Sequence, residues 1–404
     1  MTIVWETPHP GGGTGVGKFL PLLRKAVAVA EDRPDLKLQF ARALFESGQT
    51  VELIDLLKPL LTDEDAPPEL LFWLGRAAMA HGDDPMALVG LRSAAAKGMA
   101  NAFDFLAKVL ARLGREDEAL DAGLEALKRA PMNSPTLRIV AAALCSRGET
   151  ERLWDLCVDL RSRGEQSRLL SAVMVSTAAM LDYETELEKL MDRSKWFFAG
   201  RLAVSEGFNR NLAAEILAER SAKPIVTGKA TRGAGSRVDH FERVEGPHAQ
   251  YLMGKIRAAV DDYVAERERF SSDPIMADHP AAVTLESWAL AVNEDGHTAW
   301  HIHPHGWISG VYYVDMPKLE PAADPSGAIE FGPFPLGGNT QALKPHCWHV
   351  LPAPSVLLLF PSYYAHRTLP TGVTAPRICV AFDVRPSQSG STAAEQRIER
   401  SARG

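Results

Sequence analysis

Four glycines recur at a nearly constant interval in the first half of the chain. Gly48, Gly82, Gly114 and Gly148 are separated by 34, 32 and 34 residues. Each follows a segment in which apolar residues recur every three or four positions, which is the period of an amphipathic helix. A repeat of this length is typical of a pair of helices, and glycine suits the turn between them because it adopts positive φ without steric cost. The interval therefore predicts an array of stacked helix pairs.

The repeated segments resemble the tetratricopeptide repeat over roughly residues 34–165. The sequence Asp-Glu-Ala-Leu at 117–120 opens a second helix as in that family, although several signature aromatic positions carry Leu or Ala. Arrays of this kind curve into a superhelix whose concave face commonly takes extended partners. Two roles stay open: a groove for a peptide, or a scaffold that only supports the second half of the chain or mediates a homodimer.

The helical pattern stops near residue 220, and the second half has a different rhythm. Residues 223–240, with Pro224, Gly228, Gly233 and Gly235, predict a linker. One further helix is expected over residues 248–269. Short runs with strand composition then follow between turn residues, at 283–288, 310–314, 328–331, 355–360 and 377–384. Such a series predicts an all-β sandwich or barrel-like domain.

These patterns predict an α+β chain of several domains. They divide it into a lead-in at 1–18, helical repeats at 19–222, a linker at 223–240, a β domain at 241–386 and a tail at 387–404. The glycine-rich stretch at 12–18 fits the first part of a phosphate-binding loop. However, Phe19 stands where Ser or Thr would hold magnesium, and no strand precedes the stretch, so a nucleotide site is not expected.

Composition excludes some partners. The net charge of -7 argues against a protein that binds nucleic acid, because that function needs a basic surface. No window has the roughly 18 uninterrupted apolar residues of a membrane span, and the first residues lack the pattern of a secretory signal. We therefore expect no membrane association and a cytoplasmic location.

Ten of the twelve histidines lie between His240 and His366. His301 and His303 are one residue apart, so on a strand their side chains point the same way. With His366 from a distant strand they could form three ligands around a divalent iron, leaving other coordination positions open. Arg377, on the next strand, offers a planar cation suited to a carboxylate.

Taken together, several motifs resemble the 2-oxoglutarate and Fe(II)-dependent dioxygenases over about residues 283–385. They are the run HIHPHGWISGVYYV at 301–314, Phe-Pro-Ser at 360–362, His366 and Arg377. The resemblance implies a double-stranded β-helix with Fe(II) and 2-oxoglutarate as cofactors. The usual ligands in the family are His, then Asp or Glu two residues later, and a distal His. His303 stands where that carboxylate is normally found, which leaves the site one negative charge short.

An alternative carboxylate is Asp295, although it precedes the strand. The resemblance further implies that Arg377 holds the far carboxylate of 2-oxoglutarate. Tyr313 matches a position that contacts the same carboxylate in prolyl hydroxylases, and Asn293 is a candidate for a contact near the iron-bound end. Arg377 is expected to share one face of its strand with Cys379 and Ala381, and Cys379 stands where the family often has a hydroxyl residue.

The remaining candidates have structural interpretations. His297, His305, His346 and His349 are expected to be structural or surface residues, and Tyr312 and Trp307 to be core or pocket wall. The resemblance implies a hydroxylase, and the helical repeats favour a target carbon in a peptide or protein side chain. A small-molecule substrate is an alternative. A second is a catalytically inactive β domain in an interaction scaffold, which the histidine at position 303 would support.

Overall fold

A computed structural model describes residues 3–6, 19–30, 33–130, 135–225, 230–267, 279–319, 325–337 and 340–387. The glycine-rich stretch at 12–18 and, apart from Ser387, the predicted tail at 387–404 lie outside the described residues. Contacts between residues divide the chain into two units. Residues 9–166 form the helical unit, and residues 1–8 with 167–404 form the β unit.

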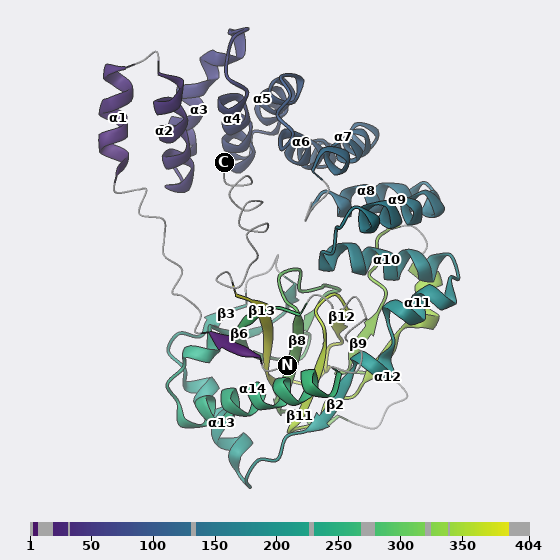
Figure 1. The fold of residues 1–404 in the computed structure, drawn as a ribbon. Helices are drawn as coiled ribbons and strands as arrows, with labels where there is room; N and C mark the ends of the chain where they lie inside the picture. Colours follow the sequence, from purple (N-terminus) through teal and green to yellow (C-terminus); the bar gives the residue numbers. More distant parts are fainter. Residues whose placement is uncertain are drawn as a thin grey trace. The chain divides into compact units, whose positions relative to one another are not determined.

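The helical unit is a series of stacked helix pairs (Figure 1). A first helix, α1 (Leu20–Val29), precedes four pairs: α2 (Pro34–Glu46) with α3 (Thr50–Leu57), α4 (Pro68–His81) with α5 (Asp84–Ala96), α6 (Ala102–Arg112) with α7 (Glu116–Arg129), and α8 (Leu137–Ser146) with α9 (Thr150–Ser162). The predicted repeat architecture is confirmed. Leucine and alanine side chains from neighbouring helices form its core.

The spaced glycines have the predicted role. Gly82 ends α4 with φ +90°, and Gly48, Gly114 and Gly148 occupy the equivalent turns with φ between +70° and +74°. A second use of glycine occurs inside the pairs: a Cβ on Gly75 would lie 2.6 Å from Leu91 Cγ. Helices α4 and α5 can therefore pack closely only because residue 75 has no side chain.

The β unit contains an eight-stranded, mainly antiparallel sheet in the order β2-β11-β8-β13-β6-β5-β3, with β1 pairing in parallel with β6. Its strands are β1 (Val4–Glu6), β2 (Phe198–Arg201), β3 (Lys223–Pro224), β5 (Gly235–Asp239), β6 (Ala282–Val292), β8 (Ile308–Asp315), β11 (Val356–Pro361) and β13 (Arg377–Pro386). A three-stranded sheet consists of β10 (Trp348–Val350), β9 (Ile329–Gly332) and β12 (Ala365–Thr368), and β4 (Thr231–Arg232) pairs with β7 (His297–Thr298). All five predicted strands are present, and the antiparallel sheets confirm the predicted fold class.

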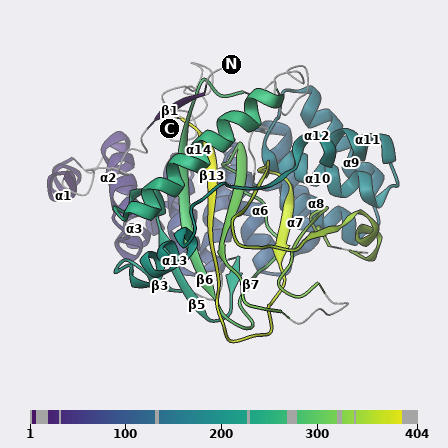
Figure 2. The same ribbon diagram turned by 90° about the horizontal axis from the view of Figure 1, so that it is seen from below.

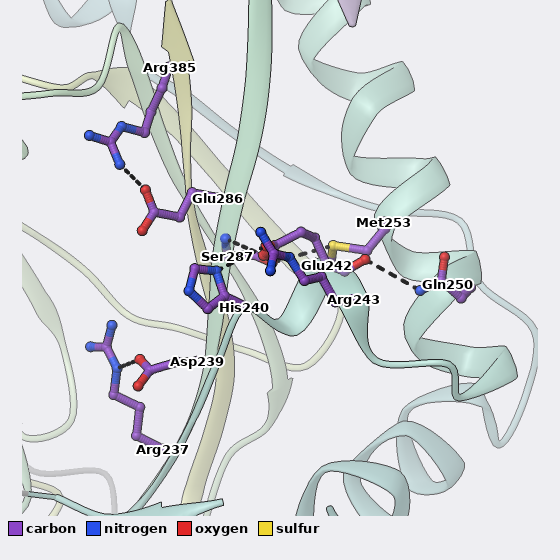
Figure 3. Close-up of polar contacts among 10 residues, drawn as sticks. All are labelled: Arg237, Asp239, His240, Glu242, Arg243, Gln250, Met253, Glu286, Ser287 and Arg385. Atoms are coloured by element: carbon purple, nitrogen blue, oxygen red, sulfur yellow. Dashed lines mark hydrogen bonds and ion pairs between the residues drawn. The ribbon is translucent and has the colours of Figure 1, made fainter. Parts of the chain in front are cut away.

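Two helices cover one face of the larger sheet. Helix α14 (Pro247–Arg267) crosses its strands, and α13 (Phe208–Ala218) contacts β8 (Figure 2). Beside α14 the carboxylate of Glu242 accepts hydrogen bonds from both the backbone N–H and the hydroxyl of Ser287 on β6, each at 2.9 Å (Figure 3). The same hydroxyl lies 3.7 Å from the sulfur of Met253 on α14. These contacts hold β6 against its helical cover.

The predicted domain boundaries differ from the observed units in two places. Residues 167–222, expected in the repeat domain, pack with the β unit as α10 (Arg168–Met180), α11 (Glu184–Leu190), α12 (Arg193–Trp196), β2 and α13. The expected linker at 223–240 contains β3, β4 and β5, and β5 pairs with β6. Helical periodicity does not reveal which core a helix joins, and short strands containing glycine resemble linkers. Among the described helices, none combines the length and apolar character that crossing a bilayer demands.

Candidate metal centre

The alternation of side chains along two strands decides which residues face the candidate site. On β8 the hydroxyl of Tyr312 donates to Asn209 Oδ1 of α13 at 2.7 Å, whereas Tyr313 faces the other way. On β6 Ser287 faces α14, and Trp288 lies on the opposite side. The face away from the helices lines a pocket of about 260 Å³ between the larger sheet and the two smaller ones.

The three predicted metal ligands lie together in this pocket. One ring nitrogen from each of His301, His303 and His366 lies within 4.8 Å of the other two, close enough for a single ion. The ring centroids of His301 and His366 are 4.3 Å apart. The backbones of these two residues exchange a pair of 3.1 Å hydrogen bonds, so main-chain pairing brings the distal histidine beside the first.

Contrary to the prediction, His301 and His303 do not lie on a regular strand. They belong to an extended segment before β8, where His301 forms an isolated bridge with His366. The N–H of His303 donates to the carbonyl oxygen of Ser362 at 3.0 Å, and Pro304 with the turn that follows ends the pairing. The two rings still face the same pocket, because alternation also holds in extended backbone outside a sheet.

Hydrogen bonds at Nδ1 fix the tautomer of the imidazole rings. The Nδ1 of His301 lies 2.8 Å from the carbonyl oxygen of Ala299, and that of His366 lies 3.0 Å from the carbonyl oxygen of Tyr364. A carbonyl oxygen only accepts, so each Nδ1 carries the proton and donates it. Each Nε2 is left with a lone pair, which is the form that binds a metal.

Burial keeps two of the rings neutral. It lowers the pKa of His301 to about 4 and holds the pKa of His366 well below 6.5, and the neighbouring histidines add to both shifts. A protonated imidazole cannot bind a metal. The lowered pKa values therefore favour the metal-binding form at neutral pH.

A carboxylate lies next to one of the three histidine rings. His303 Nδ1 lies 2.9 Å from the carboxylate of Asp383, and Ser309 Oγ donates to the same carboxylate at 2.7 Å. Burial acts to raise the pKa of Asp383, but the contacts with His303 and Ser309 hold that pKa below its usual value. Asp383 therefore places a negative charge beside the cluster of three imidazole rings.

Sequence reasoning missed Asp383, although a signal was present. Arg377, Cys379 and Ala381 were predicted to share one face of a strand, and all three line the pocket. Asp383 is the next residue in that series of alternate positions on β13. Its spacing from Arg377 therefore places it on the face of the site.

Arg377 is 2% exposed and lines the same pocket. Its Nη atoms donate to three backbone carbonyl oxygens at 3.1 to 3.3 Å and to the hydroxyl of Thr368 at 3.0 Å. No carboxylate in the described part of the chain forms an ion pair with it. A buried cation whose charge is balanced only by dipoles is suited to an anionic ligand.

The other predicted cofactor contacts have different outcomes. Tyr313 is 1% exposed and lines the pocket, and burial raises the pKa of its hydroxyl. Asn293 follows the end of β6 and is not among the residues that line the pocket; its N–H donates to the carbonyl oxygen of Ala234. Asp295 is exposed and lies outside the histidine cluster found in the described chain.

Trp288 and Arg237 are among the pocket residues that were not predicted. The indole of Trp288 stacks on the His303 ring, with centroids 5.6 Å apart and an interplanar angle of 14°. The guanidinium of Arg237 lies 5.0 Å from the Trp288 ring centroid. Trp288 belongs to a predicted strand and Arg237 to the predicted linker, so only the pairing of β5 with β6 brings them together.

The histidines expected to be structural have varied surroundings. His297 lines the pocket, with Nδ1 2.7 Å from the carbonyl oxygen of Asp295. His305 is exposed. Tyr312 and Trp307 are both buried and absent from the pocket lining, so they belong to the core.

This geometry agrees with a family match. Residues 286–383 match the family model described as "Putative 2OG-Fe(II) oxygenase". The matched segment lies within the β unit. The matched range contains the three clustered histidines and Arg377, and it ends at Asp383. No curated protein matches the chain.

Solved structures resemble parts of the chain. A prolyl-4-hydroxylase from Pseudomonas putida is 16% identical over 48% of this chain and 96% of its own, with a TM-score of 0.34. YrrB, a TPR protein described as having an unusual peptide-binding site, is 14% identical over 43% of this chain and 90% of its own, with a TM-score of 0.35.

The donor set fits a divalent metal. Three neutral imidazoles bind iron, zinc, copper or nickel, so the family match, rather than the ligand types, points to iron. The same pocket holds the buried cation of Arg377. The arrangement can therefore hold a metal and an anionic ligand side by side.

Proposed function

We propose that this protein is an Fe(II)- and 2-oxoglutarate-dependent dioxygenase that hydroxylates a peptide or protein side chain. One observation carries the proposal. The three clustered histidines and the guanidinium of Arg377, which lacks a carboxylate partner in the described chain, face one pocket. The family match supports this cofactor pair.

Each residue has a defined task in this proposal. His301, His303 and His366 would hold the iron through Nε2. Arg377 would bind the far carboxylate of 2-oxoglutarate, and the Tyr313 hydroxyl would add a contact to it. When bound, the two cofactors supply the oxidising chemistry that couples loss of carbon dioxide from the keto acid to hydroxylation of a C–H bond.

The pocket walls serve to orient groups and exclude water. Apolar side chains of Leu290, Ile329 and Phe360 line the space around the histidines. The stacked indole of Trp288 restricts the ring of His303. A site held in this way keeps its ligands in one geometry, which is what the protein must contribute to cofactor chemistry.

Uncoupled turnover tests the proposal without knowledge of the substrate. Protein purified without oxygen and loaded with Fe(II) is expected to consume 2-oxoglutarate when oxygen is admitted. His366→Ala should abolish this consumption, whereas His305→Ala, at an exposed position, should retain it. Equal consumption by wild type and His366→Ala, or none by the wild type, would favour an inactive β domain within a scaffold.

The substrate class needs a separate measurement. Incubation with peptide libraries and with free amino acids, followed by mass spectrometry, is expected to show a gain of one oxygen on a peptide. The helical unit supports this choice because stacked repeats present extended surfaces to polypeptides. A gain found only on a free amino acid or another small molecule would exclude the peptide substrate while leaving the oxygenase in place.

A further inference from the structure

The first helices of the first three pairs form the inner face of the helical unit. Helix α2 contacts α4, α4 contacts α6 and α6 contacts α8, and these contacts are more extensive than those between second helices of successive pairs. A row of pairs that is closer together on one side curves toward that side. We use "inner face" for the surface formed by α2, α4 and α6.

A cation on the inner face is surrounded by aromatic rings. The Cζ of Arg76 on α4 lies 4.5 Å from the ring centroid of Phe45, 4.8 Å from that of Trp73 and 4.9 Å from that of Phe105. These rings come from α2, α4 and α6, and all are only partly buried. The Nε of Arg76 is buried without a hydrogen-bond partner, and no carboxylate of the described chain forms an ion pair with this guanidinium.

A second cation shares one of these rings. The Nζ of Lys108 on α6 lies 4.7 Å from the Phe105 centroid. Burial lowers the pKa values of both Lys108 and Arg76, and the charge of Arg76 lowers that of Lys108 further. Asp104, one turn earlier on α6, opposes the shift at Lys108, while its carboxylate accepts a hydrogen bond from the Thr136 hydroxyl. The two cations therefore repel one another at a partly desolvated site.

The cations belong to a repeated position. Arg42, Arg76 and Lys108 each stand six residues before the turn glycine of their repeat, and the next repeat has Ala142 there. Equivalent positions on successive first helices form a column across the inner face. Aromatic faces attract such cations but do not neutralise them, so a carboxylate would add charge-assisted hydrogen bonds that the protein itself does not supply.

We propose that this column binds an acidic segment of a partner polypeptide. Carboxylate side chains would pair with Arg76 and Lys108, and intervening apolar side chains would pack on the partly exposed aromatic rings. Cations on three successive repeats suit several acidic side chains along an extended segment better than a single chain-terminal carboxylate. Binding of the acidic segment does not depend on the proposed dioxygenase activity. Only the identification of that segment as the substrate rests on the proposed function.

Fluorescent peptides test the binding directly on the full chain. The probe is an octapeptide of alternating Glu and Leu with an amidated C-terminus, and its matched control carries Gln in place of Glu. We expect the acidic peptide to bind about tenfold more tightly than the Gln peptide at low salt, and the difference to shrink at 0.5 M salt. Equal binding of both peptides would overturn the proposal, and so would binding that requires a free C-terminus.

Variants then locate the site. Lys108→Met should weaken binding of the acidic peptide about tenfold, and Arg76→Met should weaken it at least as much. Lys25→Met is the control, because it removes an exposed lysine of α1, which is not part of the inner face. Lys108→Glu should reverse the preference toward a Lys-Leu peptide. Circular dichroism checks that Lys108→Met, a change at a partly exposed position, leaves the chain folded. Unchanged affinity of this folded variant for the acidic peptide would exclude the column as the binding site.

The experiments distinguish a failure of the peptide-binding proposal from a failure of the proposed dioxygenase activity. None of the residues proposed to hold the cofactors belongs to the helical unit, so Lys108→Met should consume 2-oxoglutarate at the wild-type rate without peptide. Acidic-peptide binding without any consumption would leave the column in place and reject the oxygenase. Consumption without binding would do the reverse.

Discussion

Asp383 lies 2.9 Å behind His303, on the side of the ring away from the proposed metal. Because the ring donates from Nδ1, the carboxylate fixes the tautomer that leaves Nε2 free, and it makes that nitrogen a stronger donor to a cation. In the family pattern a carboxylate is expected at position 303 itself. Here the carboxylate belongs to Asp383 and lies behind the His303 ring. The histidine cluster therefore has a negative charge nearby, although His303 replaces the expected acidic residue.

Asp383→Asn should weaken binding of Fe(II) or Co(II) to the metal-free protein by about 10- to 100-fold, the usual cost of losing a group that orients a metal ligand. The amide keeps the size of the side chain and removes its charge. Anaerobic calorimetric titration measures the change directly. Asp315→Asn, at the exposed end of β8, is the matched control. An affinity unchanged by Asp383→Asn would show that the contact serves only the fold.

Substituting the carboxylate that the family pattern expects should not improve the site. His303→Asp would remove the donor to Asp383 and bring two carboxylates together, so we expect metal affinity to fall. Adding Asp383→Asn should then recover about tenfold, because the repulsion is relieved. The four proteins form a double-mutant cycle for metal affinity. Tighter binding by His303→Asp alone would mean that Asp383 does not compensate for the missing ligand.

Arg377→Lys keeps the charge but loses the planar fork that donates to three carbonyl oxygens. We expect the affinity for 2-oxoglutarate to fall on the order of a hundredfold, since a buried charge pair is disrupted, while metal affinity changes little. Titration of 2-oxoglutarate into the Mn(II)-loaded protein without oxygen measures the first affinity, and titration of Mn(II) into the metal-free protein measures the second. Arg201→Met, at an exposed position on β2, provides the control. Equal affinity in Arg377→Lys would place the cosubstrate elsewhere.

How much of this molecule the sequence predicts depends on how local each signal is. The helix pairs follow from glycines that the backbone needs at every turn, and the five strands follow from alternation bounded by turns. Residues 167–222 show the limit, because their helices have the same periodicity as the repeats yet pack on the β unit. An apolar stripe indicates that one face of a helix is buried, but it does not indicate which helix or sheet packs against that face.

The candidate site shows the same division. His301, His303 and His366 were predicted from spacing and resemblance, and the structure gathers them. Trp288 and Arg237 carry no motif. Trp288 stacks directly on His303, and the pairing of β5 with β6 brings Arg237 to Trp288. Long-range register is what the one-dimensional pattern leaves unspecified. Asp383 is intermediate: the strand that carries it was predicted from the sequence, but its contact with His303 was not.

Glu242 offers a test of how the pocket wall is held. The Glu242 side chain is 2% exposed and accepts two hydrogen bonds from Ser287 (Figure 3). Ser287 is the neighbour of Trp288, which lines the pocket. Glu242→Ala should lower the free energy of unfolding by about 2–4 kcal/mol, because buried donors are left without partners. Glu286→Ala, which removes a half-exposed partner of Arg385, should cost under about 1 kcal/mol. Urea unfolding compares the two, and equal losses would deny Glu242 this role.

The metal-free protein should lose stability in mild acid for a reason that lies in the site. The pKa of His301 is lowered to about 4 from 6.5, so between these values the unfolded chain binds a proton that the folded chain does not. This contribution to stability is therefore fully present above pH 6.5 and is lost as the pH falls from there toward 4. Urea midpoints of the metal-free wild type should fall over that window, and those of His301→Gln should fall less. Asp383 cannot produce this difference, because its pKa is lowered and its contribution is lost only at more acidic pH. Parallel midpoint curves for the two proteins would mean that His301 is not held neutral by its surroundings.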